Sequence, residues 1–560
     1  MKPLPSRKLS EKVPLLDCFT APCKGGCPIG QDIPEYIELC RKGEYASALR
    51  LICEKNPLPF ITGTICAHRC QTKCTRTYYD DSVQIRATKL VAAQRGYDEY
   101  LSKIKTPAPD KSGKKVAVIG GGPTGMAAAY FVGRAGIPVT VFEKADKLGG
   151  IVRQVIPGFR ISDEAIDKDA ALIAKMGAEI KLNTPAPSVA ELKAQGYTHI
   201  FFAVGAWKAG RLDIPGNVAP VIGWLKALKA GKDVSLGHVA VVGGGNTAMD
   251  AARAALRAGA KSSTLVYRRT KKYMPADAEE LELAVADGVN FLELVAPVEQ
   301  KDGKLRCEKM KLGEPDEKGR RKPEPTGEFV EIDCDTVISA VGEKVESELL
   351  TASGVEVDAK GLPDFRTNVE GVYAGGDAMR GPATVVEGIA DAQWFANAVI
   401  GDSYSFEIPA KAVASRAEAI AKKGILCESA KCEGDRCLTC NVVCQVCADV
   451  CPNRANVVIE LPDGRHEILH VDRMCNECGN CAIFCPYDSA PYRDKFTLFK
   501  TREGFDESVN NQGFLPLGGS KVLVRLEGKV FEADLNGKND LPADIEVFIL
   551  TVLNKYTYLL

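Results

Sequence analysis

KVAVIGGGPTG, residues 115–125, is the stretch that decides how the middle of this chain folds. Its first five residues are the apolar run of a buried strand, and its glycines allow a tight turn that brings the backbone close to a pyrophosphate. That pyrophosphate would lie at the N-terminus of an alanine-rich helix over 127–132. The next apolar run, 139–142, ends at Glu143, about where a carboxylate accepts hydrogen bonds from a ribose. Strand, loop, helix and acid in this order predict a dinucleotide-binding α/β unit.

The same pattern recurs in HVAVVGGGNTA, residues 238–248. Here the following strand, 264–267, leads into Arg268 and Arg269 instead of an acid. Two guanidinium groups suit a ribose 2′-phosphate, which Glu143 would repel. We therefore expect FAD at the first loop and NADP(H) at the second. The alternative for the two arginines is a solvated charge pair within a longer basic run.

A third motif supports two nucleotides in one flavoprotein. GVYAGGD, residues 371–377, is typical of a strand that ends in a glycine pair and an acid, here before an expected helix near 383–398. Asp377 can hold the ribityl or pyrophosphate end of FAD, although each glycine alone also suits an ordinary turn. The residues expected to bind FAD are Gly120, Gly122, Gly125, Glu143, Gly149, Gly150, Gly376 and Asp377. Those expected to bind NADP(H) are Gly243, Gly245, Asn246, Thr247, Arg268 and Arg269.

Cysteines are concentrated at the two ends of the chain: of 21, 8 precede residue 75 and 11 follow residue 426. The run Cys475-x2-Cys478-x2-Cys481-x3-Cys485-Pro486 is that of bacterial ferredoxins, in which three thiolates hold one [4Fe–4S] cluster and the fourth serves a neighbouring cluster. A disulfide scaffold belongs to small secreted chains, and a zinc site uses two cysteine pairs separated by a spacer. The run therefore predicts iron–sulfur clusters and electron transfer, in a reducing compartment poor in oxygen.

The cysteines before this run repeat it with one extra residue in the first gap. They read Cys440-x3-Cys444-x2-Cys447-x3-Cys451-Pro452. By the exchange of fourth ligands, Cys485 would complete the first cluster and Cys451 the second. Cys437 could replace Cys440 if the insertion bulges. Cys427 and Cys432 are left over, either as free surface thiols or as ligands to a group that a partner contributes.

Composition and charge are those of an ordinary globular protein of several domains. The chain is 45% hydrophobic and 26% charged, and its formal charge of −1 gives no reason to expect nucleic acid or a membrane surface. No apolar run approaches the roughly 20 residues that span a bilayer. Residues 1–7 lack the apolar stretch of a secretory signal. We expect a soluble, cytoplasmic protein.

Further short motifs accompany the nucleotide loops. They are Cys23-x3-Cys27-Pro28-Ile29, Asn56-Pro57-Leu58-Pro59, Ile65-Cys66-x3-Cys70-x3-Cys74, YRR at 267–269, Met274-Pro275-Ala276 and GGDA at 375–378. With these motifs, residues 18–400 resemble the small (beta) subunit of bacterial glutamate synthase, the matching region of dihydropyrimidine dehydrogenase, and the large subunit of NADH-dependent ferredoxin:NADP oxidoreductase. With its C-terminal cysteines, the chain is most similar to the flavoprotein half of the family named for selenate reductase subunits, a substrate name that we leave open.

The resemblance implies a division of labour. NADP(H) exchanges hydride with FAD, and FAD passes single electrons to the clusters, because a flavin is stable in one-electron steps. No side chain is implied as acid or base. The N-terminal cluster ligands implied are Cys18, Cys23, Cys27, Cys66, Cys70 and Cys74.

Two N-terminal clusters would need eight ligands, and this chain departs from its relatives at two places. Leu15 stands where they often have a cysteine, and Lys89, which has no lone pair when protonated, where they have Glu or Gln. We expect either one cluster or two with unusual fourth ligands. Cys40 and Cys53 lie on an expected helix over 32–55 and are interpreted as core thiols.

The predicted fold class is α/β, with iron–sulfur domains at both ends and two Rossmann-like domains between them. A Pro- and Lys-rich linker at 105–113 separates the first two domains. The expected domains are a helical iron–sulfur domain (1–106), an FAD domain in two parts (107–235 and 346–410), an inserted NAD(P) domain (236–345), a two-cluster ferredoxin-like α+β domain (411–500) and a tail that packs or docks a partner (501–560). A helix expected over 410–426 leads to the cysteines of the ferredoxin-like domain.

Three functions fit these features. The leading hypothesis is an NADP(H)-dependent FAD and iron–sulfur subunit that exchanges electrons with a partner redox subunit or a ferredoxin in a hetero-oligomer. The first alternative is a subunit of an electron-bifurcating NADH/ferredoxin:NADP transhydrogenase. The second is an autonomous NADPH-dependent reductase of a small molecule, although nothing in the sequence resembles a separate substrate domain. No nucleic acid or membrane partner is expected.

Overall fold

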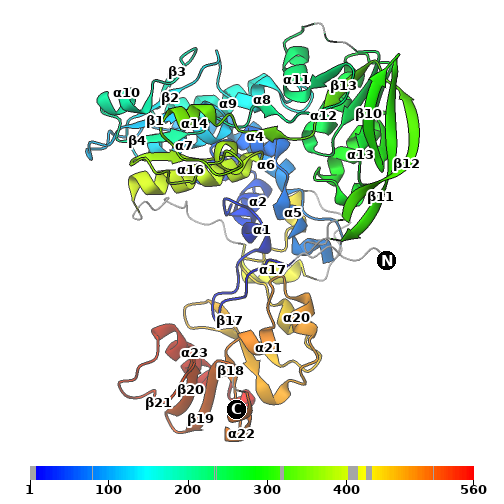
Figure 1. The fold of residues 1–560 in the computed structure, drawn as a ribbon. Coiled ribbons are helices and arrows are strands. Elements are labelled where there is room, and N and C mark those ends of the chain that lie inside the picture. The colour runs from blue at the N-terminus through cyan, green and yellow to red at the C-terminus, as the bar shows by residue number, and fades with distance from the viewer. Residues whose placement is uncertain are drawn as a thin grey trace. The chain divides into compact units, whose positions relative to one another are not determined.

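The computed structural model describes residues 8–78, 80–232, 234, 236–315, 321–401, 414–423, 432–508 and 510–560. It divides into two compact units. The cysteine-rich unit combines residues 1–51 and 68–92 with 408–560. The glycine-loop unit comprises residues 52–67 and 93–407. Figure 1 labels the elements of both.

The first sheet of the glycine-loop unit is parallel and follows the order β15-β4-β1-β2-β3. All residues of its β1 and β2 strands are buried, as expected for a sheet covered on both faces. The sheet consists of β1 (Val116–Ile119), β2 (Val139–Phe142), β3 (Glu179–Lys181), β4 (His199–Phe202) and β15 (Val372–Ala374). Helices α7 (Pro123–Arg134) and α16 (Val385–Ile400) pack against each other beside it. The expected strands at 115–119, 139–142 and 371–374 and the expected helix near 383–398 are therefore present.

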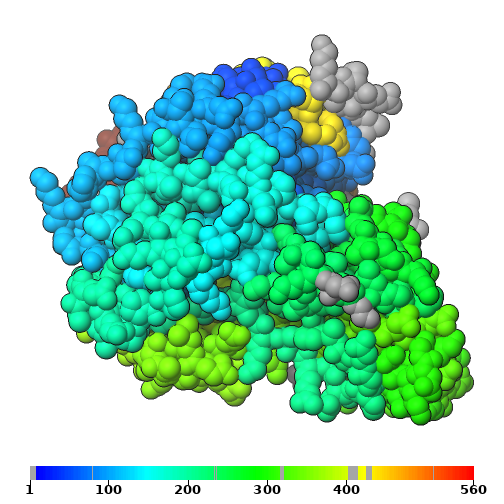
Figure 2. Space-filling view, turned by 90° about the horizontal axis from the view of Figure 1, so that it is seen from above, coloured from blue at the N-terminus to red at the C-terminus, as the bar shows by residue number. Residues whose placement is uncertain are grey.

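The second sheet is also parallel and is inserted in the chain between β4 and β15, with the order β6-β13-β7-β8-β9. Its elements are β6 (Val218–Pro220), α11 (Val221–Lys229), β7 (His238–Val242), α12 (Asn246–Arg257), β8 (Ser262–Tyr267), α13 (Ala278–Ala286), β9 (Asn290–Glu293) and β13 (Thr336–Ser339). In Figure 2 the surfaces of the first-sheet segments, in cyan, and of the second-sheet segments, in green, lie side by side on one face of this unit.

The remaining elements of this unit were not anticipated in the sequence. A three-stranded antiparallel sheet follows β9, made of β10 (Val295–Lys301), β11 (Lys304–Pro315) and β12 (Arg321–Asp333). A short antiparallel pair joins β5 (Lys208–Ala209) to β14 (Glu343–Lys344). The other helices are α4 (Pro59–Ile65), α8 (Gly150–Gln154), α9 (Asp163–Lys175), α10 (Val189–Ala194), α14 (Glu348–Ala352) and α15 (Asp377–Arg380).

At the N-terminus the structure corrects the expected single helix over 32–55. Two helices occupy this stretch, α2 (Ile33–Arg41) and α3 (Tyr45–Cys53). They are separated at Gly43, whose φ of +81° lies in the left-handed region that glycine adopts freely. The Gly43 and Glu44 amides donate to the carbonyls of Cys40 and Leu39, which is the bonding pattern of a Schellman helix end.

The C-terminal part contains a six-stranded sheet with the order β16-β17-β18-β19-β20-β21. Its strands are β16 (Asn456–Glu460), β17 (His466–Val471), β18 (Thr497–Leu498), β19 (Gly513–Gly518), β20 (Lys521–Leu526) and β21 (Lys529–Asp534). Because β18 pairs with β19 across residue 500, the strands after residue 500 belong to the same sheet as those before it. Phe496, Phe514 and Phe548 of α23 (Ala543–Lys555) form the aromatic centre of its core.

Short helices complete the cysteine-rich unit. They are α1 (Pro22–Gly25), α5 (Arg69–Thr72), α17 (Arg416–Ala421), α18 (Glu433–Arg436), α19 (Val446–Asp449), α20 (Asn480–Phe484), α21 (Pro491–Asp494) and α22 (Arg502–Glu507). The 19-residue helix α6 (Ile85–Lys103) begins in this unit and continues into the glycine-loop unit. Helix α17 lies within the helix expected over 410–426, part of which falls outside the described residues. Among the described helices, none combines the length and the apolar character of a membrane span.

Candidate functional site

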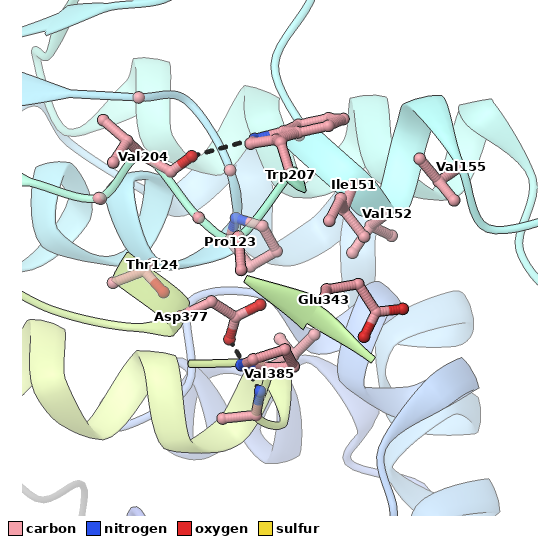
Figure 3. Close-up of a pocket in the computed structure, with 18 of the residues that line it drawn as sticks. Pro123, Thr124, Ile151, Val152, Val155, Val204, Trp207, Glu343, Asp377 and Val385 are labelled. Carbon is pink, nitrogen blue, oxygen red and sulfur yellow. Dashed lines mark hydrogen bonds between the residues drawn. The ribbon is translucent and has the colours of Figure 1, made fainter. Parts of the chain in front are cut away.

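A cavity of about 510 Å³ lies in the glycine-loop unit, in the size range of small-molecule and cofactor sites. Residues following the strands of both parallel sheets line it, including the first glycine loop, Glu143, Asp377 and the start of α12. Trp207 lies on the opposite side of the cavity from Asp377 and Val385 (Figure 3). The Trp207 ring is fixed there because its Nε1 donates to the Val204 carbonyl at 3.0 Å.

The first glycine loop fits a pyrophosphate because its turn has room only for glycine. A side chain at Gly120 or Gly125 would collide with the neighbouring backbone. Gly120 has φ +104°, and a Cβ there would lie 2.5 Å from the Ala203 carbonyl oxygen. A Cβ on Gly125 would lie 1.9 Å from the Gly120 carbonyl oxygen, so this glycine lets α7 begin directly after β1. Gly120, Gly122 and Gly150 line the cavity, whereas Gly125, Gly149 and Gly376 do not and act on the turn geometry. The exposed backbone at the start of α7 can therefore approach an anionic ligand.

Glu143 is positioned before any ligand binds. Its side chain is 6% exposed at the end of β2. One carboxylate oxygen accepts the Gly121 amide at 2.6 Å and the other accepts the Ala145 amide at 2.8 Å. The carboxylate thus ties the end of β2 to the glycine loop and faces the cavity that the loop borders. This is the arrangement that binding of a ribose hydroxyl requires.

Two carboxyl groups with raised pKa values line the other side. Asp377 accepts the Ala383 amide at 3.0 Å. Burial raises the pKa of Asp377 to about 7, and the charges of Glu343, Glu387 and Asp391 add to this shift. Burial also raises the pKa of Glu343, which stands on β14. No sequence motif marks Glu343, which reaches the cavity because β14 pairs with β5.

The second glycine loop reaches the same cavity. Asn246 and Thr247 line it, whereas Gly243 and Gly245 do not. The Asn246 amide is held because its Oδ1 accepts the Asp277 backbone amide at 3.0 Å. The loop itself is braced by the expected Met-Pro-Ala motif, since the Ala276 amide donates to the Gly244 carbonyl.

Arg268 and Arg269 lie at the end of β8 and outside the lining of the cavity. Arg268 is exposed and Arg269 half-buried. The Arg269 Nε donates to the Arg321 carbonyl at 3.3 Å, which links it to the start of β12. A phosphate bound by these guanidinium groups would therefore sit beyond the cavity, at the far end of an extended dinucleotide.

An ion-pair cluster not foreseen in the sequence joins the two sheets' segments beside the cavity. The Arg160 guanidinium pairs with Asp250 of α12 and, at 2.6 Å, with Glu280 of α13. All three side chains are buried or nearly so. Burial raises the pKa of Asp250 to about 6, against the opposing effect of Arg160. Arg160 and Asp250 also line the cavity, so this cluster fixes one wall of the site.

The Asn-Pro-Leu-Pro motif places a cysteine in the cavity wall. The Asn56 side chain accepts the Leu58 amide at 3.2 Å and donates to the Thr62 hydroxyl at 2.7 Å, which starts α4 at Pro59. The buried Asp169 carboxylate accepts the Phe60 and Ile61 amides at the first turn of α4, at 3.1 and 2.8 Å. Cys66 caps the other end of α4 and lines the cavity.

In the cysteine-rich unit, three thiols of the ferredoxin run and one from the repeat before it share one recess. These residues are Cys451, Cys475, Cys478 and Cys481, the set expected for the second cluster. Among the described residues, no three His, Cys, Asp or Glu side chains converge on a single metal ion. A cube of four irons needs its thiolates farther apart than a single zinc ion with bonds of about 2.3 Å, so this finding concerns mononuclear sites.

Two of the other expected ligands also contact residues far along the chain. Cys18 lies in a buried cluster with Cys447, Ile468 and Cys481 of the C-terminal part. The Cys440 Sγ lies 2.9 Å from the Thr75 hydroxyl, next to Cys74 in the N-terminal motif.

The remaining cysteines and their neighbours are placed as follows. Cys53 is 1% exposed, as expected of a core thiol, whereas Cys40 is half-buried. Lys89 is buried on α6. The His68 ring lies 3.1 Å from the Arg86 guanidinium. Cys427 lies outside the described residues.

Comparison with known proteins finds two family models and several relatives that match this chain. The family model for pyridine nucleotide-disulphide oxidoreductases matches residues 114–392, and that for the 4Fe-4S cluster domain II of dihydropyrimidine dehydrogenase matches residues 9–99. YgfK of Escherichia coli (strain K12) is 42% identical, covering 97% of this chain and 55% of that protein. The NADPH-Fe(3+) oxidoreductase subunit beta of Geobacter sulfurreducens (strain ATCC 51573 / DSM 12127 / PCA) is 37% identical, covering 67% of this chain and 63% of that subunit. The NADPH glutamate synthase small chain of Escherichia coli (strain K12) is 31% identical, covering 69% of this chain and 89% of that one.

These matches and the two glycine loops define an NAD(P)H-dependent flavin and iron–sulfur oxidoreductase. The chain belongs to the family of FAD-, NADP- and iron–sulfur-dependent oxidoreductases that includes the small chain of glutamate synthase. It spans about half the length of YgfK and less than two thirds of the Geobacter subunit.

Proposed function

We propose that this chain carries electrons between NADP(H), FAD and [4Fe–4S] clusters, and exchanges them with a partner redox subunit or a ferredoxin. The observation that carries the proposal is the shared cavity, in which Glu143 and Asp377 face the same space as Asn246 and Thr247 of the second glycine loop. Cys66, an expected cluster ligand, lines that space as well. Two nucleotide sites and a thiol at one cavity are what hydride entry and single-electron exit require.

The residues have separate tasks in this proposal. FAD, when bound, supplies the conversion between hydride and single-electron transfer. The first glycine loop would hold its pyrophosphate, Glu143 a ribose, and Asp377 the ribityl region. Asn246 and Thr247 would orient NADP(H) toward the cavity, while Arg268 and Arg269 would pair with the 2′-phosphate.

No side chain in the cavity has to transfer a proton for hydride exchange. The apolar side chains of Ile151, Val152, Val155 and Ile222 in the lining suit a different task, which is to keep water away from the reacting rings. Asp377 and Glu343 line the same cavity, and their carboxyl groups have raised pKa values. Each can therefore form hydrogen bonds there as a neutral acid or as a carboxylate.

A partner subunit is supported by the names of two relatives. The Geobacter protein and the NADP(+)-dependent formate dehydrogenase protein of Moorella thermoacetica are both named as beta subunits. For this chain we propose a similar place in a hetero-oligomer, with the terminal acceptor contributed by the partner.

The test is anaerobic purification of the native protein with its accompanying chains. We expect bound FAD, iron and sulfide, bleaching of the flavin by NADPH, and a co-purifying subunit with its own redox cofactor, identified by mass spectrometry. A protein without FAD, or one whose flavin NADPH does not reduce, would exclude the proposed function. A chain that comes alone and reduces a small molecule with NADPH would replace it with the autonomous reductase.

A further inference from the structure

The N-terminal segment lies along the C-terminal ferredoxin-like part within the cysteine-rich unit. Leu9 forms a parallel bridge with Tyr487, and the Leu9 amide donates to the Pro486 carbonyl at 2.8 Å. The Lys495 ammonium donates to the Pro14 and Leu15 carbonyls at 2.7 and 3.0 Å. These bonds anchor the segment that leads directly to Cys18.

Cys18 is delivered to the C-terminal thiols by a second anchor. The Asp17 amide donates to both carboxylate oxygens of Glu467, at 2.9 and 3.1 Å. Cys18, 8% exposed, then lies in one buried cluster with Cys447, 9% exposed, Ile468 and Cys481. Leu15 stands where relatives often have a cysteine, and it packs against the C-terminal core.

The neighbours of Cys18 form a set of four thiols. Burial raises the pKa of Cys447, and the charges of Cys18, Cys444 and Cys485 raise it further. Burial likewise raises the pKa of Cys485 to about 11, with further contributions from Cys444 and Cys18. Cys18, Cys447 and Cys485 are buried and Cys444 is half-buried. Four neighbouring thiols are the ligand number of one [4Fe–4S] cluster.

Cys440 and Cys437 belong to another set. The Cys440 Sγ lies 2.9 Å from the Thr75 hydroxyl, next to Cys74 in sequence. After burial, the charges of Cys74, Cys437, Cys440 and Cys70 are what raise the pKa of Cys23. Burial raises the pKa of Cys437 to about 12, and the charge of Cys74 adds to this shift. Cys23, Cys74, Cys437 and Cys440 are therefore gathered at one place, with Cys70 beside them.

Polar contacts hold these two stretches together. The Arg436 guanidinium pairs with Asp80 at 3.1 Å and also contacts the Asp81 carbonyl. The Glu433 carboxylate accepts the Gln84 amide at 2.9 Å. On the other side of the set, Asn441 donates to Glu35 of α2 at 3.0 Å. The Cys437–Cys440 stretch is thus bonded to the N-terminal part on both sides.

We propose that the two ends of the chain exchange ligands, so that Cys23, Cys74, Cys437 and Cys440 hold one [4Fe–4S] cluster and Cys18, Cys444, Cys447 and Cys485 hold another. This inference rests on the iron–sulfur part of the proposed function and goes beyond it. It gives Cys437 a ligand role and accounts for the missing cysteine at Leu15. The third set, Cys451, Cys475, Cys478 and Cys481, stays as the ferredoxin run predicts.

The exchange has a consequence for electron flow. Cys440 and Cys444 are four positions apart but would serve different clusters. Burial raises the pKa of Cys444, and the charges of Cys440 and Cys18 raise it further. These two neighbours of Cys444 belong to different sets. The two clusters would therefore be immediate neighbours, and electrons could pass between the N-terminal and C-terminal parts without a mobile carrier.

The experiment compares pairs of Cys→Ala changes in the full chain, purified anaerobically. Iron and sulfide per chain are measured with the EPR signals of the reduced protein. The pairs Cys23→Ala/Cys440→Ala and Cys18→Ala/Cys447→Ala should each alter a single cluster and lose about four irons. The pair Cys440→Ala/Cys447→Ala should alter two clusters. The reverse pattern, one altered cluster in Cys440→Ala/Cys447→Ala and two in the others, would overturn the exchange.

Controls separate this inference from misfolding and from the proposed function. Cys307→Ala, at a buried thiol in the glycine-loop unit, should leave iron unchanged, and FAD content reports the fold of each variant. If a pair does not fold, alkylation of the wild-type holoprotein decides. Cys18 and Cys437 should resist iodoacetamide until the iron is removed, and rapid labelling of either would refute its ligand role. Wild-type protein without any iron would instead refute the proposed function itself.

Discussion

The Thr75 hydroxyl lies 2.9 Å from the Cys440 Sγ, although 365 positions separate the two residues. Thr75 is buried directly after Cys74, and Cys440 follows the two-residue gap from Cys437. One hydrogen bond therefore joins the N-terminal cysteine motif to the C-terminal one. It also points to a group that can tune a cluster, because hydrogen bonds to cluster sulfurs change reduction potential.

Replacing Thr75 by Val should lower the reduction potential of one cluster. Without the hydroxyl, the thiolate charge of Cys440 is less stabilised, and the more negative reduced cluster loses more than the oxidised one. A hydrogen bond to a charged group contributes about 1.5 kcal/mol, so the shift is at most roughly 60 mV for one electron. An EPR-monitored redox titration measures it. Thr75→Ser, which keeps the hydroxyl, should restore the wild-type value, and an unshifted potential in Thr75→Val would contradict the contact.

Replacing Arg268 and Arg269 together by Ala should raise the KM for NADPH much more than that for NADH. Loss of charge-assisted bonds worth about 1.5–3 kcal/mol corresponds to about 10–100-fold in affinity. Steady-state kinetics with both nucleotides and an artificial acceptor give the ratio. Lys272→Ala, in the same basic run, serves as the control for a general loss of positive charge. Equal effects on both nucleotides would show that the arginines are a solvated pair.

Replacing Arg160 by Met should destabilise the glycine-loop unit. Asp250 would remain buried without its ion-pair partner, and Glu280 would keep only the Arg253 guanidinium at 3.7 Å. Breaking a buried pair costs about 3–5 kcal/mol. Thermal unfolding followed by release of flavin fluorescence should show a lower Tm. Asp333→Asn, which breaks the exposed pair with Lys304, should cost under about 1 kcal/mol. Similar small losses in both variants would mean that the Arg160 cluster does not hold the site together.

The sequence predicted the local elements well where the signal was itself local. The strand at 139–142 has the predicted bounds, and the loops at 120–125 and 243–248 lead into the helices expected after them. These features depend on burial periodicity and on glycine, which act over a few residues. The prediction of a single helix over 32–55 was wrong, because Gly43 adopts a left-handed conformation that ends the first helix. A lone glycine inside an apolar pattern does not predict such a helix end.

The missing parts of the site depend on tertiary pairing. Glu343, Arg160 and Trp207 belong to no motif, and they line the cavity only because the chain returns to it from distant segments. The cysteine spacing predicts thiolate ligands, but it could not place Cys18 in a cluster with Cys447 and Cys481. Spacing constrains thiols on one turn or loop, whereas the partner across the fold is decided by anchors such as Asp17 and Glu467.

Asp377 should make the stability of the FAD-free protein depend on pH. Burial raises its folded pKa to about 7, above the value of 3.8 in an unfolded chain, so between these values the folded state holds a proton that the unfolded state has lost. Stability from this group is therefore fully present below about pH 4 and declines as pH rises toward 7, by at most about 1.4 kcal/mol per pH unit. Asp377→Asn removes the effect, so its Tm should exceed that of wild type at pH 8 and approach it at pH 4. Asp213→Asn, at an exposed carboxylate, is the matched control. A Tm difference that stays constant from pH 4 to pH 8 would show that the Asp377 carboxyl is already ionised in the folded protein.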